Sequence, residues 1–310
     1  MSMTAAARRI AQTVYRRLAA PAGVRALERS LRGGLPAQLG PALRFLFTGE
    51  VPEYARQAAV HVEALRAEVA ARPDRFHYVY RPSPLGAVRW PERLPEGQTA
   101  DETITLRELA RRISVPQRWG LFLHLVCEGF GARTVLETGA CVGISGAYLA
   151  SVSTRPRFVT VEGSEALAAI TTSTVASVSD AATVVAQPFE TGIGSALSLL
   201  GDEGRPVDVA YIDGHHDQQA TLHYVEQVRP HLSANAVVIL DDIHLYTEMW
   251  SAWQSILATY GFTAAINVGR FGVLVWNGSA AASTAHYDLA RYTGWWRVGR
   301  SRQRSLHAPG

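Results

Sequence analysis

Between residues 133 and 277, short apolar runs alternate with longer segments of helical periodicity. Short apolar runs bounded by turn residues are typical of buried strands, and strands that alternate with helices favour a parallel sheet. The predicted fold is α/β and doubly wound (Rossmann-like), with a mostly parallel seven-stranded sheet. Its last strand is antiparallel because it follows a hairpin at Val268-Gly269-Arg270. The predicted strands are residues 134–137, 158–161, 183–186, 207–212, 236–240, 262–267 and 271–276.

The first third of the chain has a helical pattern. Ile10, Val14 and Leu18 recur at helical spacing, and Pro21 is expected to end that helix. Residues 74–97 are rich in proline and aromatic residues, which predicts an ordered but irregular connector. Further helices are predicted at residues 24–31, 35–47, 52–71, 105–113 and 116–130. We divide the chain into a helical accessory region with its connector (1–98), a core (99–277) and an Arg-rich aromatic tail (278–310).

Composition and charge fit a protein with a full core and no membrane span. The 310 residues are 47% hydrophobic, and the net charge of +3 is too small to indicate nucleic-acid binding. No apolar stretch approaches ~20 residues and arginines interrupt the N-terminus, so neither a transmembrane helix nor a secretory signal is expected. Two cysteines without metal-ligand spacing favour a reducing cytoplasm. Abundant Ala and Arg, with no Lys, suggest a GC-rich bacterial genome.

Positive charge is concentrated near the N-terminus. Up to Thr48 the only acid is Glu28, against eight arginines. This pattern is typical of a solvated helical face. It also leaves open a contact with a partner, with a membrane surface or with a second copy of the chain.

The first predicted strand ends in E-T-G-A-C-V-G (residues 137–143), an acid followed by two glycines. Glycines let the backbone approach a ligand closely, and ligands bind at the carboxyl ends of strands in such sheets. A dinucleotide fingerprint would need glycine where Cys141 stands, and Glu137 would repel a pyrophosphate. The pattern favours a ligand with positive charge. Glu162, after the second strand, suits the hydroxyls of a ribose, although it could also be an exposed acid near a helix start.

The segment E-T-G-A-C-V-G-I-S (residues 137–145) resembles motif I of the class I S-adenosylmethionine-dependent methyltransferases. It is most similar to that of catechol O-methyltransferase and the bacterial small-molecule O-methyltransferases, and the resemblance covers residues 103–276. It implies S-adenosylmethionine as the donor, with Gln187 and Phe189 beside the adenine, although Phe189 could be ordinary core. The residues implied at the donor are Glu137, Gly139, Ala140, Gly143, Ser145, Glu162, Gly163, Gln187, Phe189 and Asp213.

Three carboxylates follow two neighbouring strands, Asp213 in I-D-G-H-H and the pair Asp241-Asp242 in L-D-D-I-H. Such acids repel one another unless a cation lies between them, and oxygen ligands suit Mg²⁺ or Ca²⁺. The resemblance implies a Mg²⁺ site at these three residues, although the relatives carry Asp-Asn where this chain has Asp-Asp. The alternative is that one of the pair caps a helix.

Histidines near these acids are candidate general bases. Relatives with this metal site often carry a Lys three residues after the strand-four Asp, and that position is His216 here. An imidazole can accept a hydroxyl proton at neutral pH. His215 and His244 are neighbouring candidates, and any of the three could instead be a polar loop residue.

The predicted function is methylation of a small-molecule hydroxyl, phenolic or sugar, with S-adenosylmethionine and a divalent metal. One alternative is an NAD(P)-dependent oxidoreductase, which leaves Glu137 and the three aspartates unexplained; another is a non-catalytic S-adenosylmethionine-binding scaffold. Nucleic acid is a disfavoured substrate because strand four lacks a D/N-P-P-Y/F motif and no aromatic-basic RNA-binding module is visible. The aromatic residues that could stack on an acceptor, or pack elsewhere, are Phe76, Tyr78, Tyr80, Trp90, Trp295 and Trp296.

Overall fold

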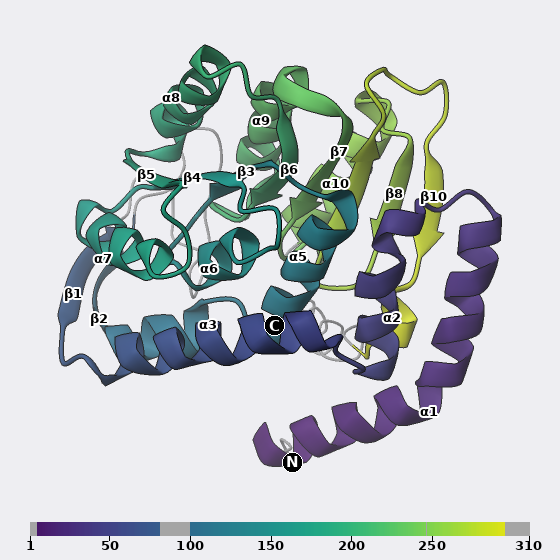
Figure 1. Cartoon of the computed structure of the whole chain (residues 1–310), viewed down its shortest axis with the longest axis horizontal. Helices are drawn as coiled ribbons and strands as arrows, with labels where there is room; N and C mark the ends of the chain where they lie inside the picture. The colour runs from purple at the N-terminus through teal and green to yellow at the C-terminus, as the bar shows by residue number, and fades with distance from the viewer. Residues whose placement is uncertain (1–4, 81–99, 246, 295–310) are drawn as a thin grey trace, which may run out of the picture.

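The computed structural model describes residues 5–80, 100–245 and 247–294, and its centre is an eight-stranded sheet with helices on both faces (Figure 1). The strands of this sheet are β3 (Thr134–Thr138), β4 (Arg157–Glu162), β5 (Ala182–Ala186), β6 (Val207–Ile212), β7 (Leu232–Leu240), β8 (Ala264–Asn267), β9 (Gly272–Trp276) and β10 (Ala285–Asp288). Their order across the sheet is β10-β8-β9-β7-β6-β3-β4-β5.

The predicted doubly wound α/β fold is confirmed, and the sheet has one strand more than predicted. Strands β3 to β7 run parallel, whereas β9 is antiparallel to both of its neighbours, β7 and β8. Since β9 is the last of the seven predicted strands, its direction is as expected. The extra strand, β10, pairs with β8 and lies in the tail. Three of its four residues are exposed, so no apolar alternation marks it in the sequence.

Side chains of the central strands enter two hydrophobic cores, one on each face of the sheet. Val209 and Tyr211 of β6 belong to one core, and Ala210 and Ile212 belong to the other. This division follows from the alternation of side chains along a strand. The first core includes α5 (Gln117–Phe130), α6 (Ile144–Ala150) and α7 (Glu165–Ala176); the second is closed by α8 (Phe189–Asp202), α9 (Gln218–Val228) and α10 (Thr247–Thr259).

The N-terminal region consists of α1 (Ala5–Arg32), α2 (Gly40–Thr48) and α3 (Glu53–Ala71). The prediction that Pro21 ends the first helix is wrong, because α1 continues through Pro21 to Arg32. The two halves of α1 run in different directions (Figure 1). A proline in a helix has this effect because it lacks the N–H that would bond to the preceding turn.

Helix α3 is tied to the rest of the molecule by polar bonds as well as by apolar packing. The guanidinium of Arg66 donates to the carbonyl oxygens of Ala110 and Val115, at 2.6 and 2.7 Å. Tyr148 of α6 donates its hydroxyl to Glu63 at 2.9 Å. Residues of α2 and α3 also belong to the first hydrophobic core. The N-terminal helices and the sheet are therefore one packed unit.

Part of the connector, predicted to be irregular, forms a strand. Residues 75–80 are β1 (Arg75–Tyr80), which pairs antiparallel with β2 (Ala100–Thr105). The chain then forms α4 (Leu106–Glu108) and a π-helical turn, η2 (Leu109–Ile113), before α5. Trp90, Trp295 and Trp296 lie outside the described residues, so the suggested stacking of these aromatic residues on an acceptor stays a prediction.

The C-terminal elements of the described chain lie beside the second half of α1 and beside α2 (Figure 1). The hydroxyl of Tyr287 in β10 donates to the carbonyl oxygen of Gly33, just after α1, at 2.9 Å. Arg118 of α5 donates to the carbonyl oxygens of Leu46 in α2 and of Thr293 in α11 (Ala290–Thr293), so one side chain joins three helices. Across the described ranges, every helix is too short or too polar to span a bilayer.

Candidate active site

The carboxyl ends of β4, β3, β6 and β7 lie side by side because these strands are adjacent and parallel. Backbone bonds continue past the strand ends. The N–H of Gly139 donates to the carbonyl of Val161 at 3.0 Å, and that of Asp213 donates to the carbonyl of Thr138 at 3.2 Å. Asp241 is anchored in the same way to the end of β6, at 3.0 Å. The residues that follow these strands therefore share one surface.

The glycine turn between β3 and α6 has a backbone that few side chains tolerate. Gly139, Cys141 and Gly143 have φ angles of +83°, +55° and +81°. A Cβ atom on Gly139 would lie 1.7 Å from the carbonyl oxygen of Asp213. Glycine is therefore needed at position 139 both for the left-handed backbone and for the close approach of the β6 loop.

Glu137 lies in β3, just before this turn, and is 0% exposed. Its Oε2 accepts the hydroxyl of Thr160 at 2.7 Å, and the hydroxyl of Ser145 is a further partner. Within the described part of the chain, Oε1 has no hydrogen-bond partner. Burial raises the pKa of Glu137 to about 7, so both protonation states are populated near neutral pH. Glu137 therefore joins β4 to the start of α6 through Thr160 and Ser145, and Ser145 is buried as well.

Glu162, at the end of β4, connects the glycine turn to the start of α7. Its Oε2 accepts the backbone N–H of Cys141 at 2.8 Å, and its Oε1 accepts that of Ser164 at 2.9 Å. Burial raises the pKa of Glu162, and these backbone bonds oppose the shift. A carboxylate offers about four lone-pair positions and the backbone N–H groups of Ser164, Cys141 and Gly163 occupy three, so Glu162 can still accept a ligand hydroxyl. Gly163, beside it, is exposed.

The two residues predicted beside the adenine differ in their surroundings. Gln187 is exposed, and its Oε1 accepts the hydroxyl of Ser195 at 2.8 Å. Phe189 is half-buried and packs edge-on against His215, with 5.2 Å between the ring centroids. A Cβ atom on Gly214 would lie 2.5 Å from the Phe189 ring. Phe189 therefore joins the loop after β5 to the loop after β6.

The three candidate bases have different neighbours, and only His216 is placed beside the aspartates. Its Nε2 lies 3.3 Å from Oδ1 of Asp213. Nδ1 of His215 lies 2.5 Å from the hydroxyl of Tyr224, and His244 stacks on a tryptophan of α10 with 4.6 Å between ring centroids. Burial lowers the pKa of both His215 and His244.

Asp213 and Asp241 share a network with Tyr211 and Arg270. The Tyr211 hydroxyl lies 2.9 Å from Oδ2 of Asp241 and 3.2 Å from Oδ2 of Asp213. Arg270 donates through Nε and Nη2 to the two oxygens of Asp241, each at 2.6 Å, in the bidentate geometry of the strongest ion pairs. Burial and the nearby Asp241 charge raise the pKa of Asp213 well above its ordinary value. Burial also tends to raise the pKa of Asp241, but the Arg270 charge and its hydrogen bonds outweigh burial, so the pKa of Asp241 is lowered.

This network does not fit the predicted metal site. Oδ1 of Asp241 accepts from Arg270 and from the backbone N–H of Asp242, and Oδ2 accepts from Arg270 and Tyr211. A carboxylate offers about four lone-pair positions, so Asp241 has none left for a metal. Among the described residues, no three or more His, Cys, Asp and Glu side chains are grouped so that they could hold a metal ion. We therefore assign no metal to this site.

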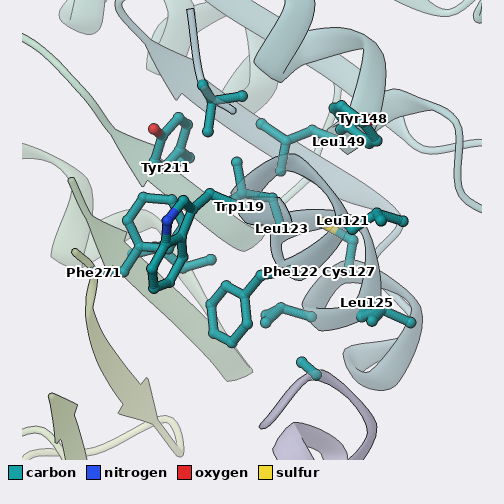
Figure 2. Close-up of a cluster of buried hydrophobic side chains, with 14 of the residues drawn as sticks. Trp119, Leu121, Phe122, Leu123, Leu125, Cys127, Tyr148, Leu149, Tyr211 and Phe271 are labelled. Atoms are coloured by element: carbon teal, nitrogen blue, oxygen red, sulfur yellow. The ribbon is translucent and has the colours of Figure 1, made fainter. Parts of the chain in front are cut away.

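No sequence pattern predicted a role for Arg270 or Tyr211. The strand register explains the position of Arg270. Gly272 of β9 lies opposite Leu240 of β7, so the hairpin before Gly272, which contains Arg270, lies beside the acids that follow Leu240. Tyr211 has the pattern of a buried strand residue, and its ring lies 5.7 Å from that of Phe271 at the margin of the aromatic cluster in Figure 2. Its hydroxyl nevertheless reaches both aspartates.

The doubly wound sheet, the glycine turn after β3 and Glu162 after β4 agree with the resemblance to the class I methyltransferases. Residues 136–243 match the family model described as a methyltransferase domain. This match confirms the enzyme class that motif I predicts. A comparison with curated proteins gives no match.

Solved structures of methyltransferases are also similar to this chain. One is the O-methyltransferase from Bacillus cereus in complex with SAH, at 24% identity over 52% of this chain and 82% of that chain, with a TM-score of 0.44. Another is the O-methyltransferase TomG from Streptomyces achromogenes, involved in tomaymycin synthesis and in complex with SAM, at 20% identity over 54% and 83%, with a TM-score of 0.47.

Proposed function

We propose that the protein transfers a methyl group from S-adenosylmethionine to a hydroxyl group of a small molecule. The observation that carries this proposal is the strained glycine turn held against Glu162 by the Cys141 N–H, at 2.8 Å. This arrangement offers a ligand a closely approachable backbone and a carboxylate in reach of ribose hydroxyls. Both features lie within the matched methyltransferase domain.

The donor would lie across the turn of residues 139–143. Glu162 would accept its ribose hydroxyls, and Gln187 and Phe189 would flank the adenine. Gly163 and Asp213 would border it because they directly follow β4 and β6. Glu137 would act from β3, just before the turn, where its partly ionised carboxyl favours a positively charged donor over a pyrophosphate.

His216 is the proposed base for the acceptor hydroxyl. Its Nε2 lies 3.3 Å from Oδ1 of Asp213, which orients the imidazole ring and leaves Nδ1 to take the proton. S-adenosylmethionine supplies a methyl group bound to a positively charged sulfur. The acceptor oxygen, having given its proton to His216, bonds to the methyl carbon while the carbon–sulfur bond breaks and its electron pair stays with sulfur. The chain contributes proximity and alignment of the two reactants.

The remaining parts of the proposal concern the acceptor, the assembly and the cell compartment. The acceptor is a phenolic or sugar hydroxyl. The N-terminal helices form any contact between copies of the chain. Cys127 and Cys141 are both free thiols, which is the usual state in a reducing cytoplasm. A divalent metal is not included, because Asp241 has no lone pair to offer.

Calorimetric titration of the full chain with S-adenosylmethionine, with NAD as the comparison ligand, tests this function. We expect S-adenosylmethionine to bind and NAD to give no heat. Glu162→Gln should weaken donor binding by about 10- to 100-fold, the usual loss when a hydrogen bond to a charged group is weakened. The exposed Glu165, at the start of α7, is the matched control, and Glu165→Gln should bind as the wild type does. Binding of NAD in place of S-adenosylmethionine would overturn the proposal in favour of an oxidoreductase.

A further inference from the structure

We propose that Arg270 supplies the fixed positive charge among the three aspartates, in place of the divalent metal that the resemblance implies, and that methyl transfer by this protein needs no metal. The proposal rests on the proposed methyl-transfer function. Metal binding can be measured without turnover, so the role of Arg270 and the methyl-transfer function can be tested separately. Arg270 is a positioning residue, because its guanidinium acts through Asp241.

The first support is the saturation of Asp241. This side chain is 0% exposed, and each of its oxygens has two donors within 2.9 Å. Two of these donor hydrogens come from the fork of one guanidinium, which matches a carboxylate in shape. A metal ion could reach Asp241 only after Arg270 had left it. Buried carboxylates need a cationic partner, and this one has its partner within the chain.

The second support is the way in which the fold holds Arg270 in place. The backbone N–H of Ile243, just after the aspartate pair, donates to the carbonyl oxygen of Arg270 at 3.1 Å. The next residue, Phe271, is fully buried and packs edge-on against Trp119 with 4.9 Å between ring centroids (Figure 2). The Arg270 side chain is only 11% exposed. Its position is therefore set by the core and by the strand register, and it does not depend on a chance contact at the surface.

The third support is the charge balance of the site. Arg270 lies against Asp241 and 3.7 Å from Oδ1 of Asp242, so its charge is shared by two of the three acids. The third acid, Asp213, is joined to Asp241 through the Tyr211 hydroxyl and faces His216. A second cation with two charges would lie close to the guanidinium and be repelled by it. Arg270 thereby fixes the carboxylates that hold the proposed base.

Mn²⁺ binding to the full chain, after treatment with a chelator, tests this proposal directly. Free Mn²⁺ is followed by its electron paramagnetic resonance signal, and thermal unfolding is measured with and without the ion. We expect the wild type to bind no Mn²⁺ stoichiometrically, to keep its Tm when the ion is added, and to methylate equally well in chelator. Stoichiometric Mn²⁺ binding with loss of turnover in chelator would overturn the proposal.

Arg270→Ala gives the opposite expectation, because it leaves Asp241 and Asp242 without their cation. This variant should bind Mn²⁺, gain about 2 °C or more in Tm from it, and lose about 100-fold in metal-free turnover, as expected for catalytic groups misplaced by about 1 Å. Arg270→Lys keeps the charge and should not bind the ion, and the exposed Arg107 provides the control Arg107→Ala. If Arg270→Ala does not fold, Mn²⁺ binding to the wild type and to Arg270→Lys still tests whether Arg270 takes the place of the metal. A wild type that binds neither Mn²⁺ nor S-adenosylmethionine would support the role of Arg270 and overturn the proposed function.

Discussion

Four residues at the strand ends carry side chains on a left-handed backbone. Cys141, His215, His216 and Asp242 have φ angles of +55°, +52°, +46° and +49°, and Arg155 is the other such non-glycine residue in the described ranges. Each conformation of this kind costs about 1–3 kcal/mol and persists only where the surroundings determine it. Most of the backbone strain of this kind is therefore gathered at the proposed active site.

His216→Ala is expected to reduce turnover by about 10²- to 10⁴-fold, the range for loss of a general base, with donor affinity unchanged. The reason is that His216 alone among the three candidate histidines lies beside Asp213. Initial rates and calorimetric donor affinity would be measured together. His231→Ala is the matched control, because His231 is exposed in η3 (Arg229–His231), at the opposite end of β7. Wild-type turnover in His216→Ala would remove this residue as the base.

Glu137 should make the stability of the protein depend on pH. Its folded pKa of about 7 is raised above the ordinary 4.5, so the folded state holds its proton more tightly than the unfolded state does. Its contribution to stability is complete below about pH 4.5 and is lost as pH rises through about 7. This loss amounts to about 3 kcal/mol.

Glu137→Gln removes this titration and retains an oxygen that can accept from Thr160. Chemical denaturation of both proteins from pH 5 to pH 8 measures the difference, and the variant should become the more stable of the two as pH rises. Parallel stability curves across this range would show that Glu137 titrates as an ordinary acid.

At the scale of elements, the sequence correctly predicts those strands that carry a local apolar pattern. The strand at residues 207–212 has the predicted bounds because all but one of its residues are buried. β7 starts four residues before its predicted start, because its first residues are partly or fully exposed and show no apolar run. β10 and the role of Arg270 depend on pairing between distant segments. Such pairing leaves no periodicity in the sequence.

The glycine turn is the element whose geometry allows the sharpest test. Gly139→Ala should abolish donor binding and destabilise the protein by about 3 kcal/mol or more, because the new Cβ meets the Asp213 carbonyl at 1.7 Å. Gly194→Ala, on the exposed face of α8 with no atom within 4 Å, should stabilise by up to about 1 kcal/mol. Denaturant titration and donor calorimetry measure both. A fully active Gly139→Ala protein would contradict the proposed role of this turn as the donor cradle.

At the scale of the whole molecule, the N-terminal helices are expected to be indispensable for folding. Removal of residues 1–72 takes away the α2 and α3 side chains of the first core and the Arg66 and Glu63 contacts. The shortened chain should show no cooperative thermal transition. Removal of residues 1–14 is the control and should leave Tm unchanged, because Val14 is already half exposed. A native-like Tm without residues 1–72 would mean that the core folds alone.

The contact between the N-terminal helices and the elements β10 and α11 bears on how the protein is made. The hydroxyl of Tyr287 and the carbonyl of Gly33 are 254 residues apart in sequence, and Arg118 bonds to both α2 and α11. On a ribosome that adds about 5–20 residues each second, the N-terminal helices emerge many seconds before these partners do. The apolar faces of these helices stay uncovered until the sheet has been made, and the contacts to Tyr287 and Thr293 form only after those residues have been released. Newly made chains of this protein should therefore depend on chaperones more than a smaller domain with local contacts does.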